Sequence, residues 1–340
     1  MSDDIPVGVL GVGRIGLFHC ERISSTPGLR LAAVSSRAPR QTEEARRRFA
    51  VKTYPRHEDL ISDGGVRWIV IATTSDQHYS WALAALRAGK NVIIEKPIAL
   101  SYQEAAEIYQ AAAGRGLSVL PHQSRRWDRD FLLVQRAMAE GLLGSVYRIE
   151  SRRASFSSGW AGWGAQGMDN PWRLKRKFGG GMLNDWAPHL VDQVLMLARS
   201  PLASVSAWSG GKVWTDEVDD HFWAELAFRN GLSCRIEASN NHRIPLPRWT
   251  VVGTRGTLLV RGEAVDSWHQ AELATEFNGV PEVRHYDISG SELTDAFYDA
   301  FAEAVRSSKE LPITRDQVLA VMETIDLIRQ SAAQGRSVTP

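Results

Sequence analysis

The sequence predicts an α/β protein of two domains, in which a doubly wound parallel sheet precedes an α+β domain with a large, mainly antiparallel open sheet. At 340 residues the chain is longer than one hydrophobic core usually serves. Its first third alternates short apolar runs with amphipathic stretches, which is typical of parallel strands joined by crossover helices. After about Gln123 the β-branched and aromatic alternation of antiparallel strands dominates. We therefore predict domains at 1–123 and 124–340.

Strands and helices alternate regularly in the predicted first domain. Ser101, followed three residues later by Glu104, forms a capping box that should begin the last helix of this domain. The expected strands are Val7–Leu10, Leu31–Ser35, Trp68–Ala72, Val92–Ile94 and Ser118–Leu120. The expected helices are Ile15–Ser24, Gln41–Ala50, Gln77–Ala88 and Tyr102–Ala113.

The predicted second domain contains mostly strands, with one helix before them and two helices after them. The helices are expected at Leu132–Ala139, Thr294–Ser307 and Arg315–Gln334. The strands are expected at Val146–Phe156, Val205–Val213, Phe222–Phe228, Leu232–Ala238 and Trp249–Val252. A broad sheet of this kind would expose a large apolar face in a monomer, so we expect a homodimer or homotetramer built on that face.

Composition excludes several classes of protein. The 40 basic and 39 acidic residues nearly cancel, which removes the electrostatic footprint of a nucleic-acid binder. No window approaches the ~18–20 apolar residues of a membrane span, and the first residues lack the basic start of a secretory signal. Cys20 and Cys234 lie far apart in no metal-ligand spacing. We expect a soluble cytoplasmic protein with no membrane partner, no nucleic-acid partner and no metal.

A glycine-rich turn follows the first predicted strand and opens the first predicted helix. It reads Gly11, Gly13 and Gly16, with Arg14 and Ile15 between the last two glycines. The first glycine permits the tight turn, the second lets the backbone approach a pyrophosphate, and the third lets the helix pack on the strand. Exposed N–H groups and the helix dipole favour the negative charge. This context predicts a Rossmann domain that binds a nicotinamide dinucleotide.

The end of the second predicted strand indicates which dinucleotide binds. Enzymes that use NAD usually place an acidic residue there to bind the ribose hydroxyls, and this chain has none. Hydroxyl and guanidinium groups that suit a 2′-phosphate stand there instead, and NADP is therefore favoured over NAD. The alternative is that these arginines lie on a solvated surface turn and bind no cofactor. The residues concerned are Ser35, Ser36, Arg37 and Arg40.

Lys96 directly follows the fourth predicted strand, within the run Glu95-Lys96-Pro97. The carboxyl edge of a doubly wound sheet is where such folds bind ligands. A cation at that edge can hold a substrate hydroxyl or carbonyl oxygen and stabilise charge that develops on it. Lys96 is therefore a candidate catalytic residue.

A second candidate constellation follows the glycines at 179–181. If the segment is helical, Asp185, His189 and Asp192 lie on one face, at spacings of four and three residues. Pro188 then belongs to the first turn or marks a kink. By itself an Asp–His pair at this spacing is more often structural than catalytic.

Taken together these motifs resemble the Gfo/Idh/MocA family, which includes glucose–fructose oxidoreductase and the inositol dehydrogenases. The resemblance covers nearly the whole chain and is carried by GVGRIG, ATTSDQH, EKP, RRWD, Trp172-Arg173 and GGGMLNDWAPHLVDQ. It implies that Lys96, Asp185 and His189 form the catalytic set. It also implies that the cofactor is lined by Thr73, Thr74, His78, Glu95, Lys96, Trp172 and Arg173. Ala187 departs from the glycine usual in the family.

The expected reaction moves a hydride between the nicotinamide and a hydroxyl or carbonyl carbon of a sugar, sugar derivative or cyclitol. His189 would take the hydroxyl proton, Lys96 would hold the oxygen, and Asp185 would orient the imidazole. Trp163 and Arg126 are further candidates for substrate contact, since aromatic faces suit ring faces. The alternative for Trp163 is ordinary packing.

Two other functions stay open at this point. Relatives in the same family include glycosidases that use bound NAD transiently, and these keep the glycine turn as well. A catalytically silent sensor that binds a dinucleotide is the second alternative. A sensor has no chemical need for Lys96, Asp185 and His189 together, which argues against it.

Overall fold

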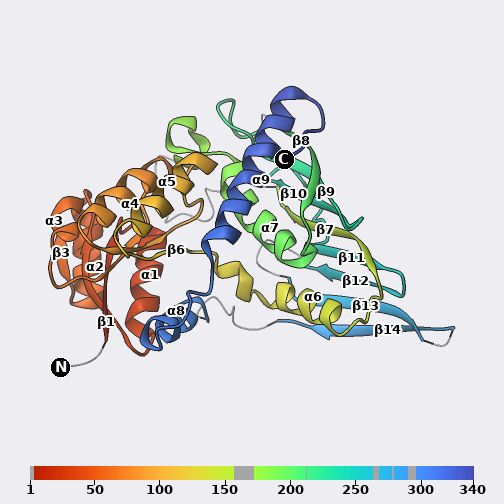
Figure 1. Cartoon of the computed structure of the whole chain (residues 1–340), viewed down its shortest axis with the longest axis horizontal. Coiled ribbons are helices and arrows are strands. Elements are labelled where there is room, and N and C mark those ends of the chain that lie inside the picture. The colour runs from red at the N-terminus through yellow and green to blue at the C-terminus, as the bar shows by residue number, and fades with distance from the viewer. Residues whose placement is uncertain (1–3, 157–171, 212, 263–267, 278, 290–295) are drawn as a thin grey trace. The chain divides into compact units, whose positions relative to one another are not determined.

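The computed structural model describes residues 4–156, 172–211, 213–262, 268–277, 279–289 and 296–340, which form two compact units (Figure 1). The first unit comprises Met1–Gln123, Lys177–Gly179 and Asp295–Met322. The second comprises Ser124–Arg176, Gly180–Thr294 and Glu323–Pro340. The predicted division after residue 123 coincides with one of these boundaries, whereas the segment Asp295–Met322 packs with the first unit instead of the second.

The first unit is built on a six-stranded sheet in the order β3-β2-β1-β4-β5-β6, with every pair parallel. This confirms the predicted doubly wound sheet, whose order reverses between β1 and β4. The strands are β1 (Ile5–Leu10), β2 (Leu29–Ser35), β3 (Lys52–Tyr54), β4 (Trp68–Ile71), β5 (Asn91–Ile94) and β6 (Val119–Pro121). Of these, β3 was not predicted, because three residues with an exposed lysine carry no hydrophobic pattern.

Helices connect the strands of this sheet. They are α1 (Arg14–Ser25), α2 (Pro39–Phe49), α3 (His57–Ile61), α4 (His78–Arg87) and α5 (Tyr102–Ala113), with the 3-10 turn η1 (Ser75–Gln77) before α4. The Ser101 hydroxyl accepts from the Glu104 N–H at 3.2 Å, so the predicted cap of α5 is confirmed. The Glu104 carboxylate in turn accepts from the N–H of Leu100 at 2.9 Å.

One aromatic helix from the end of the chain, α8 (Ala296–Arg306), belongs to this first unit. Phe301 packs edge-on against Trp68 of β4, with 4.8 Å between ring centroids. Tyr298 and Phe297 are fully buried beside the residues at the end of β6 and in α1. Hydrophobic periodicity predicts that such a helix is buried, but it does not say which sheet the helix covers.

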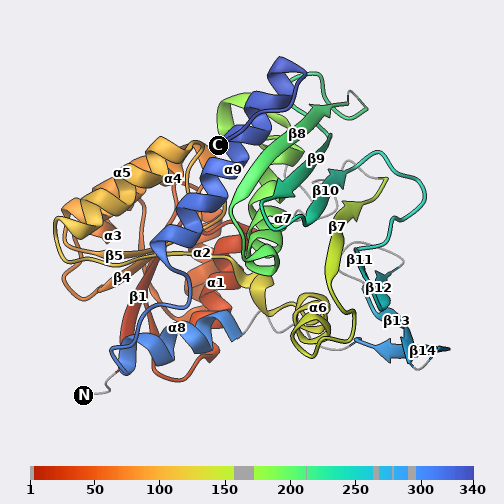
Figure 2. The ribbon, with the colours of Figure 1, turned by 45° about the vertical axis from the view of Figure 1, so that its right-hand side comes forward.

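The second unit is built on an eight-stranded sheet in the order β14-β13-β12-β11-β7-β10-β9-β8, seen edge to edge in Figure 2. Among the described strand pairs of this sheet only β7 and β10 run parallel, which confirms the mainly antiparallel sheet predicted. The strands are β7 (Val146–Ala154), β8 (Leu202–Gly210), β9 (His221–Phe228), β10 (Ser233–Ser239), β11 (Trp249–Gly253), β12 (Gly256–Arg261), β13 (Gln270–Phe277) and β14 (Val280–Asp287). The last three strands were not predicted.

Helices of the second unit cover one face of this sheet. They are α6 (Arg129–Ala139), α7 (Met182–Ala198) and the end of α9 (Arg315–Gln334), with the short 3-10 turns η2 (Ser124–Trp127), η3 (Trp172–Leu174) and η4 (Arg176–Phe178). Helix α7 packs on β7, β9 and β10, and α6 packs on β12. Among the described residues no helix is long and apolar enough to cross a membrane.

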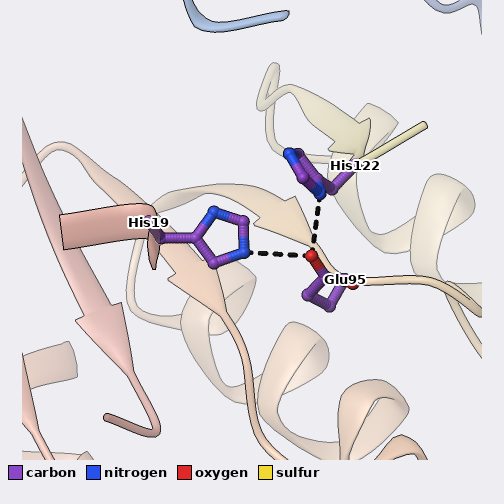
Figure 3. A group of neighbouring side chains, drawn as sticks. All are labelled: His19, Glu95 and His122. Atoms are coloured by element: carbon purple, nitrogen blue, oxygen red, sulfur yellow. Dashed lines mark hydrogen bonds and ion pairs between the residues drawn. The ribbon is translucent and has the colours of Figure 1, made fainter. Parts of the chain in front are cut away.

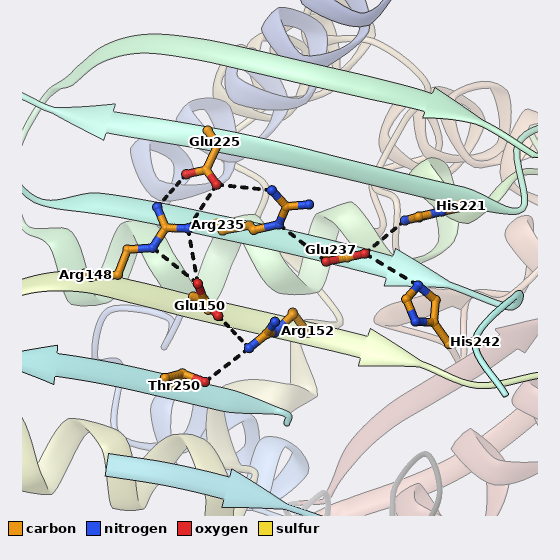
Figure 4. A network of polar contacts seen from close by, with 9 residues as sticks. All are labelled: Arg148, Glu150, Arg152, His221, Glu225, Arg235, Glu237, His242 and Thr250. Atoms are coloured by element: carbon orange, nitrogen blue, oxygen red, sulfur yellow. Dashed lines mark hydrogen bonds and ion pairs between the residues drawn. The ribbon is translucent and has the colours of Figure 1, made fainter. Parts of the chain in front are cut away.

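The opposite face of the sheet is charged, so the expected apolar face is wrong for the described residues of β7, β9 and β10. Arginine and glutamate alternate along β7, while Ile149 and Ser151 point to the buried side. The charged side chains join across strands in one network (Figure 4). Three arginines and three glutamates take part: Arg148, Arg152, Arg235, Glu150, Glu225 and Glu237.

A buried polar network ties the helices of the second unit to its sheet. Arg248, just before β11, is fully buried, and its Nε lies 3.1 Å from the Asp130 carboxylate in α6. The same guanidinium donates to the hydroxyl of Ser151 and to the side-chain oxygen of Gln193, both at 2.6 Å. Trp249 donates its indole N–H to Asp130 at 2.7 Å. The network therefore joins α6, α7, β7 and β11.

We expect Arg248→Met to lower the free energy of unfolding by about 3–5 kcal/mol, because it leaves the buried Asp130 carboxylate without its cation. Urea denaturation followed by circular dichroism measures this. The matched control is Arg261→Ala, which removes an arginine that is 53% exposed in its pair with Glu272, where exposed ion pairs contribute only about 0–1 kcal/mol. Equal losses for the two variants would show that burial of Arg248 contributes nothing special.

Candidate functional site

The glycine turn lies between β1 and α1, at the point where the strand order of the first sheet reverses. Gly11 has a φ of +87°, and a side chain there would meet the carbonyl oxygen of Ala72 at 2.7 Å. A Cβ on Gly16 would lie 1.9 Å from the oxygen of Gly11, so helix and turn pack closely. Around Gly13 there is open space. A tight turn with one accessible glycine backbone fits a dinucleotide pyrophosphate. Beside it, Arg14 is exposed and Ile15 half-buried.

The predicted ribose-binding residues follow β2 and differ in their exposure. Ser35 is fully buried and its hydroxyl lies 2.8 Å from Nδ1 of His57. Ser36 donates to the side chain of Gln41 and accepts from the N–H of Ala38. Arg37 and Arg40 are both exposed, and Arg37 reaches Gln77 at 3.4 Å. The two guanidinium groups, more than the two hydroxyls, are thus available at the strand end where a ribose lies.

His78 joins the loops that follow β4 and β5. It is buried at the start of α4, with Nδ1 2.7 Å from the carbonyl oxygen of Pro97 and Nε2 3.2 Å from that of Thr73. Burial lowers the pKa of His78 despite its two carbonyl neighbours. A neutral ring carries one N–H, and the shorter contact assigns it to Nδ1. Thr73 and Thr74 lie on the first of these loops, and the buried hydroxyl of Thr74 has no protein partner among the described residues.

Glu95 is buried between two histidines at the end of β5 (Figure 3). Its Oε1 accepts from Nε2 of His19 at 3.0 Å and from Nδ1 of His122 at 2.8 Å. On its other side, Nδ1 of His19 lies 2.6 Å from the hydroxyl of Tyr298. The resemblance implied a place for Glu95 in the cofactor lining, whereas in the first unit its carboxylate faces this buried cluster of His19, His122 and Tyr298.

Charge and burial act in opposite directions within this cluster. Burial raises the pKa of Glu95, but the electrostatic attraction of the His122 and His19 rings and the hydrogen bonds from them outweigh burial and hold that pKa well below its ordinary value. Burial lowers the pKa of His19, although its hydrogen bond to Glu95 opposes this. Glu95 is therefore an ionised carboxylate that a neutral His19 ring supports.

Lys96 follows this carboxylate directly and depends on it for its backbone position. The N–H of Lys96 donates to Oε2 of Glu95 at 3.0 Å, so both carboxylate oxygens have protein partners. The Lys96 side chain is half-buried at the carboxyl end of β5. This is the edge of the sheet at which the glycine turn and Thr73 also lie. The first unit thus brings a cation to the edge where a dinucleotide is expected.

The segment after the glycines at 179–181 is helical, as predicted, and forms α7 in the second unit. Asp219 fixes its first turn, since its carboxylate accepts from the N–H of Leu183 at 2.8 Å. Burial raises the pKa of Asp219 to about 6. Pro188 is the seventh residue of α7, so it lies in the second turn, where it removes one backbone hydrogen bond, and the first-turn alternative was wrong.

Asp185 and His189 stand one turn apart on α7. Oδ1 of Asp185 lies 3.4 Å from Nε of Arg173, whose guanidinium stacks at 4.3 Å over the ring of Trp172. His189 is 7% exposed and packs edge-on against Trp186, with 5.7 Å between the ring centroids. The second unit thus brings Trp172, Arg173 and Asp185 together.

Asp192, the third residue of this helix face, has a structural partner. Both of its oxygens receive hydrogen bonds from Arg126, at 2.8 Å and 2.6 Å, and both residues are buried. Bidentate pairing of this kind fixes the orientation of both groups. Arg126, predicted to contact substrate, therefore anchors η2 to α7 in the second unit. Trp163, the other predicted substrate residue, lies outside the described residues.

The histidines around Glu95 and the acid that caps α7 were not predicted from the sequence. His122 follows β6 as Glu95 follows β5, and neighbouring parallel strands end at the same edge of a sheet. That rule would have placed the two side chains together. No sequence signal points to His19, which lies on a helix face that is otherwise apolar, or to Asp219, which comes from a loop remote in sequence.

Comparison with known proteins identifies the family. Residues 5–122 match the oxidoreductase family with an NAD-binding Rossmann fold, and residues 131–259 match the GFO/IDH/MocA C-terminal domain. The chain is 30% identical to the uncharacterised oxidoreductase YdgJ of Escherichia coli, over 98% of this chain and 97% of that protein. It belongs to the Gfo/Idh/MocA family.

Two other proteins are similar to this Gfo/Idh/MocA chain over nearly its whole length. The scyllo-inositol 2-dehydrogenase (NADP(+)) IolW of Bacillus subtilis is 25% identical, over 99% of this chain and 96% of the relative. An NAD-binding protein of Listeria innocua has a similar structure, with a TM-score of 0.86 and 29% identity over 99% of this chain and 97% of the other. This Gfo/Idh/MocA protein is an oxidoreductase with an NAD(P)-binding Rossmann domain.

We expect the free energy of unfolding of this Gfo/Idh/MocA protein to fall as the pH drops below about 6.5. The pKa values of His19 and His78 are lowered in the folded state. At a pH below the ordinary pKa of histidine, these two side chains therefore bind protons in the unfolded chain but not in the folded chain. Each histidine contributes a slope of up to about 1.4 kcal/mol per pH unit.

Urea denaturation between about pH 7.5 and 5.5 measures this slope. His19→Gln and His78→Gln should each make it shallower. The control His285→Gln changes a histidine whose side chain is 73% exposed, and should leave the slope as in the wild type. A slope that none of the three substitutions alters would show that other groups cause the acid sensitivity.

Proposed function

We propose that this protein is an NADP-dependent dehydrogenase that interconverts a secondary hydroxyl and a ketone on a cyclitol, a sugar or a sugar derivative. The observation that carries the proposal is the position of Lys96 at the edge of the sheet that carries the glycine turn, fixed there by Glu95. Similarity to a relative named as an NADP-dependent scyllo-inositol dehydrogenase supports the substrate class and the cofactor.

Bound NADP would supply the nicotinamide that accepts the hydride. The open backbone of Gly13, at the N-terminus of α1, suits the pyrophosphate, and the exposed Arg37 and Arg40 suit the 2′-phosphate. The remaining residues proposed to line the cofactor, Thr73, Thr74 and His78, stand on the neighbouring loop after β4. Trp172 and Arg173 are proposed to complete the lining, as the family resemblance implies.

We assign the proton transfer to three residues of this chain. Lys96 holds the substrate oxygen and stabilises the negative charge that develops on it. His189 takes the hydroxyl proton while the hydride leaves the same carbon, so that the alcohol becomes a ketone. Asp185 orients the imidazole and stabilises its charged form. Nε of Arg173 lies 3.4 Å from Oδ1 of Asp185, so a guanidinium stands beside this carboxylate.

The location and assembly of the protein are part of the proposal. We propose a cytoplasmic enzyme that forms a homodimer or homotetramer through the outer face of its second sheet. Alternating arginines and glutamates on that face offer complementary charges to a second copy, and Trp208 on β8 is 42% exposed beside them. Light scattering at micromolar concentration tests the assembly, and a monomer would contradict it.

A panel of cyclitols and sugars, each incubated with NAD or NADP, tests the proposed reaction. The expected result is one mole of reduced nicotinamide for each mole of ketone formed, with a higher kcat/KM for NADP than for NAD. Cleavage of a glycoside without net formation of reduced nicotinamide would contradict the proposal and identify the protein as a glycosidase.

Removal of the proposed base should lower turnover sharply. We expect His189→Ala to reduce kcat by roughly a hundred- to ten-thousand-fold, the range for losing a general base. Lys96→Met and Asp185→Asn should lower kcat in the same direction, because the oxyanion loses its cation and the imidazole loses its orientation. Fluorescence titration with NADP should show near-normal binding in His189→Ala and Asp185→Asn.

The double variant Lys96→Met/His189→Ala tests whether the two residues act in one step. Residues that act as a unit give losses that are far from additive, so the double variant should be scarcely slower than the worse single variant. Losses that multiply would mean that the two residues serve different steps, and wild-type turnover in His189→Ala would place the base elsewhere.

Arg37 and Arg40 should set the preference between the two cofactors. Each charge-assisted contact to a 2′-phosphate contributes about 1.5–3 kcal/mol when well formed. The double variant Arg37→Ala/Arg40→Ala should therefore weaken NADP binding much more than NAD binding, as calorimetric dissociation constants would show. Arg47→Ala, on the exposed side of α2, is the matched control. An unchanged ratio of the two constants in the double variant would rule out this role.

A further inference from the structure

Two histidines approach one carboxylate oxygen at the end of the charged sheet face (Figure 4). Nε2 of His221 lies 3.0 Å from Oε1 of Glu237, and Nε2 of His242 lies 3.6 Å from the same oxygen. All three candidate ligand atoms lie within 4.8 Å of one another. The sequence predicted no metal, because Cys20 and Cys234 stand in no metal-ligand spacing, whereas this group comes from three separate segments.

The register of the sheet brings His221 and Glu237 together. Strands β9 and β10 are antiparallel, and Glu237 stands opposite Trp223, two residues from His221. Residues two apart on a strand share a face, so His221 and Glu237 are diagonal neighbours on the outer face. Such neighbours are within reach of long side chains. The register of β9 and β10 therefore places these two residues next to each other.

The backbone after β10 positions the second histidine. The N–H of His242 donates to the carbonyl oxygen of Ser155, just beyond β7, at 3.0 Å. The His221 and His242 rings stand almost perpendicular, at 85°, with 5.5 Å between their centroids. Their Nε2 atoms thus approach the carboxylate from two directions, as separate ligands of one ion would.

We propose that His221, Glu237 and His242 bind a divalent first-row transition metal, of which zinc is the best match, through Nε2, Oε1 and Nε2. Zinc lies about 2.0–2.2 Å from nitrogen and oxygen ligands, so tetrahedral geometry separates the ligand atoms by about 3.4 Å. The distances of 3.0 Å and 3.6 Å bracket that value. Two histidines and one glutamate are an established zinc donor set, with water in the fourth position.

An arginine holds the Glu237 carboxylate from its other side. Arg235 contacts the other oxygen, Oε2, at 3.4 Å. It therefore orients the carboxylate without occupying Oε1.

Partial exposure separates this group from the buried cluster around Glu95. In the single chain the side chains of His221 and His242 are 21% and 29% exposed, which leaves room there for an ion and for a water ligand. His19, Glu95 and His122 are all buried, so that cluster offers an ion no such access. Zinc at His221, Glu237 and His242 would join β9 and β10 to the segment that follows β10.

Calorimetric titration of the full-length, chelator-treated protein with zinc chloride tests the proposal. The wild type should bind one zinc ion per chain that the double variant His221→Gln/His242→Gln does not bind. Each single variant should weaken binding by at least the about 10–100-fold that the loss of an outer-shell partner costs. Magnesium chloride should not bind, since Mg²⁺ prefers oxygen ligands.

His285→Gln is the matched control, because His285 and Glu272 form an exposed histidine–carboxylate pair at 4.0 Å. Among the described residues this pair belongs to no group of three candidate metal ligands. This variant should bind zinc as the wild type does. Zinc should also raise Tm in the wild type and in His285→Gln, but not in the double variant, whose fold circular dichroism would verify. Absence of saturable zinc binding to the wild type, or unchanged binding by the folded double variant, would overturn the proposal.

Discussion

The hydrogen bonds that Glu95 makes in the interior of the first unit are the interaction on which the candidate chemistry depends. A carboxylate buried without partners would take up a proton. Here His19 and His122 hold one oxygen, and the backbone N–H of Lys96 holds the other. The ionised carboxylate therefore fixes the start of the loop that carries Lys96. A surface ion pair would hold that loop far less firmly.

On α7 in the second unit, too, acidic residues fix the backbone that carries the candidate catalytic residues. Asp192 is committed to a buried bidentate pair with Arg126, which locks the helix against η2. Asp219 satisfies N–H groups at the beginning of the helix. With these two acids in structural roles, Asp185 and His189 are the residues of this helix whose proposed role is chemical. Rigid support of this kind is what a proton acceptor requires, because small displacements slow proton transfer strongly.

The first sheet and most of its helices could be predicted, because parallel strands that are buried on both sides give continuous apolar runs. The glycine turn predicted the Rossmann domain, because its spacing reflects positions where a side chain would clash with the backbone. The structure shows such positions at Gly11 and Gly16. The sheet edge made Lys96 a candidate, and the family resemblance then joined it with Asp185 and His189 in one catalytic set, which is a proposal. The confirmed elements are thus those whose pattern is local in sequence.

The elements that escaped prediction depend on long-range pairing. Strands β12, β13 and β14 form the edge of the second sheet, where β14 is largely exposed and so lacks a strong hydrophobic pattern. The charged outer face was mistaken for an apolar one, because single residues such as Arg148 and Glu225 look like ordinary surface charges until the register pairs them. Helix α8 was assigned to the other unit because periodicity does not name its partner.

The central claim is that a hydride passes from a carbinol carbon of the substrate to the bound nicotinamide and leaves with it. The most direct measurement uses a cyclitol or sugar that is deuterated at the carbon to be oxidised, with mass spectrometry of the nicotinamide product. Direct transfer predicts one deuterium atom on each reduced cofactor released and none in the ketone. Deuterium that returns to the carbohydrate product, with no labelled cofactor released, would contradict the account.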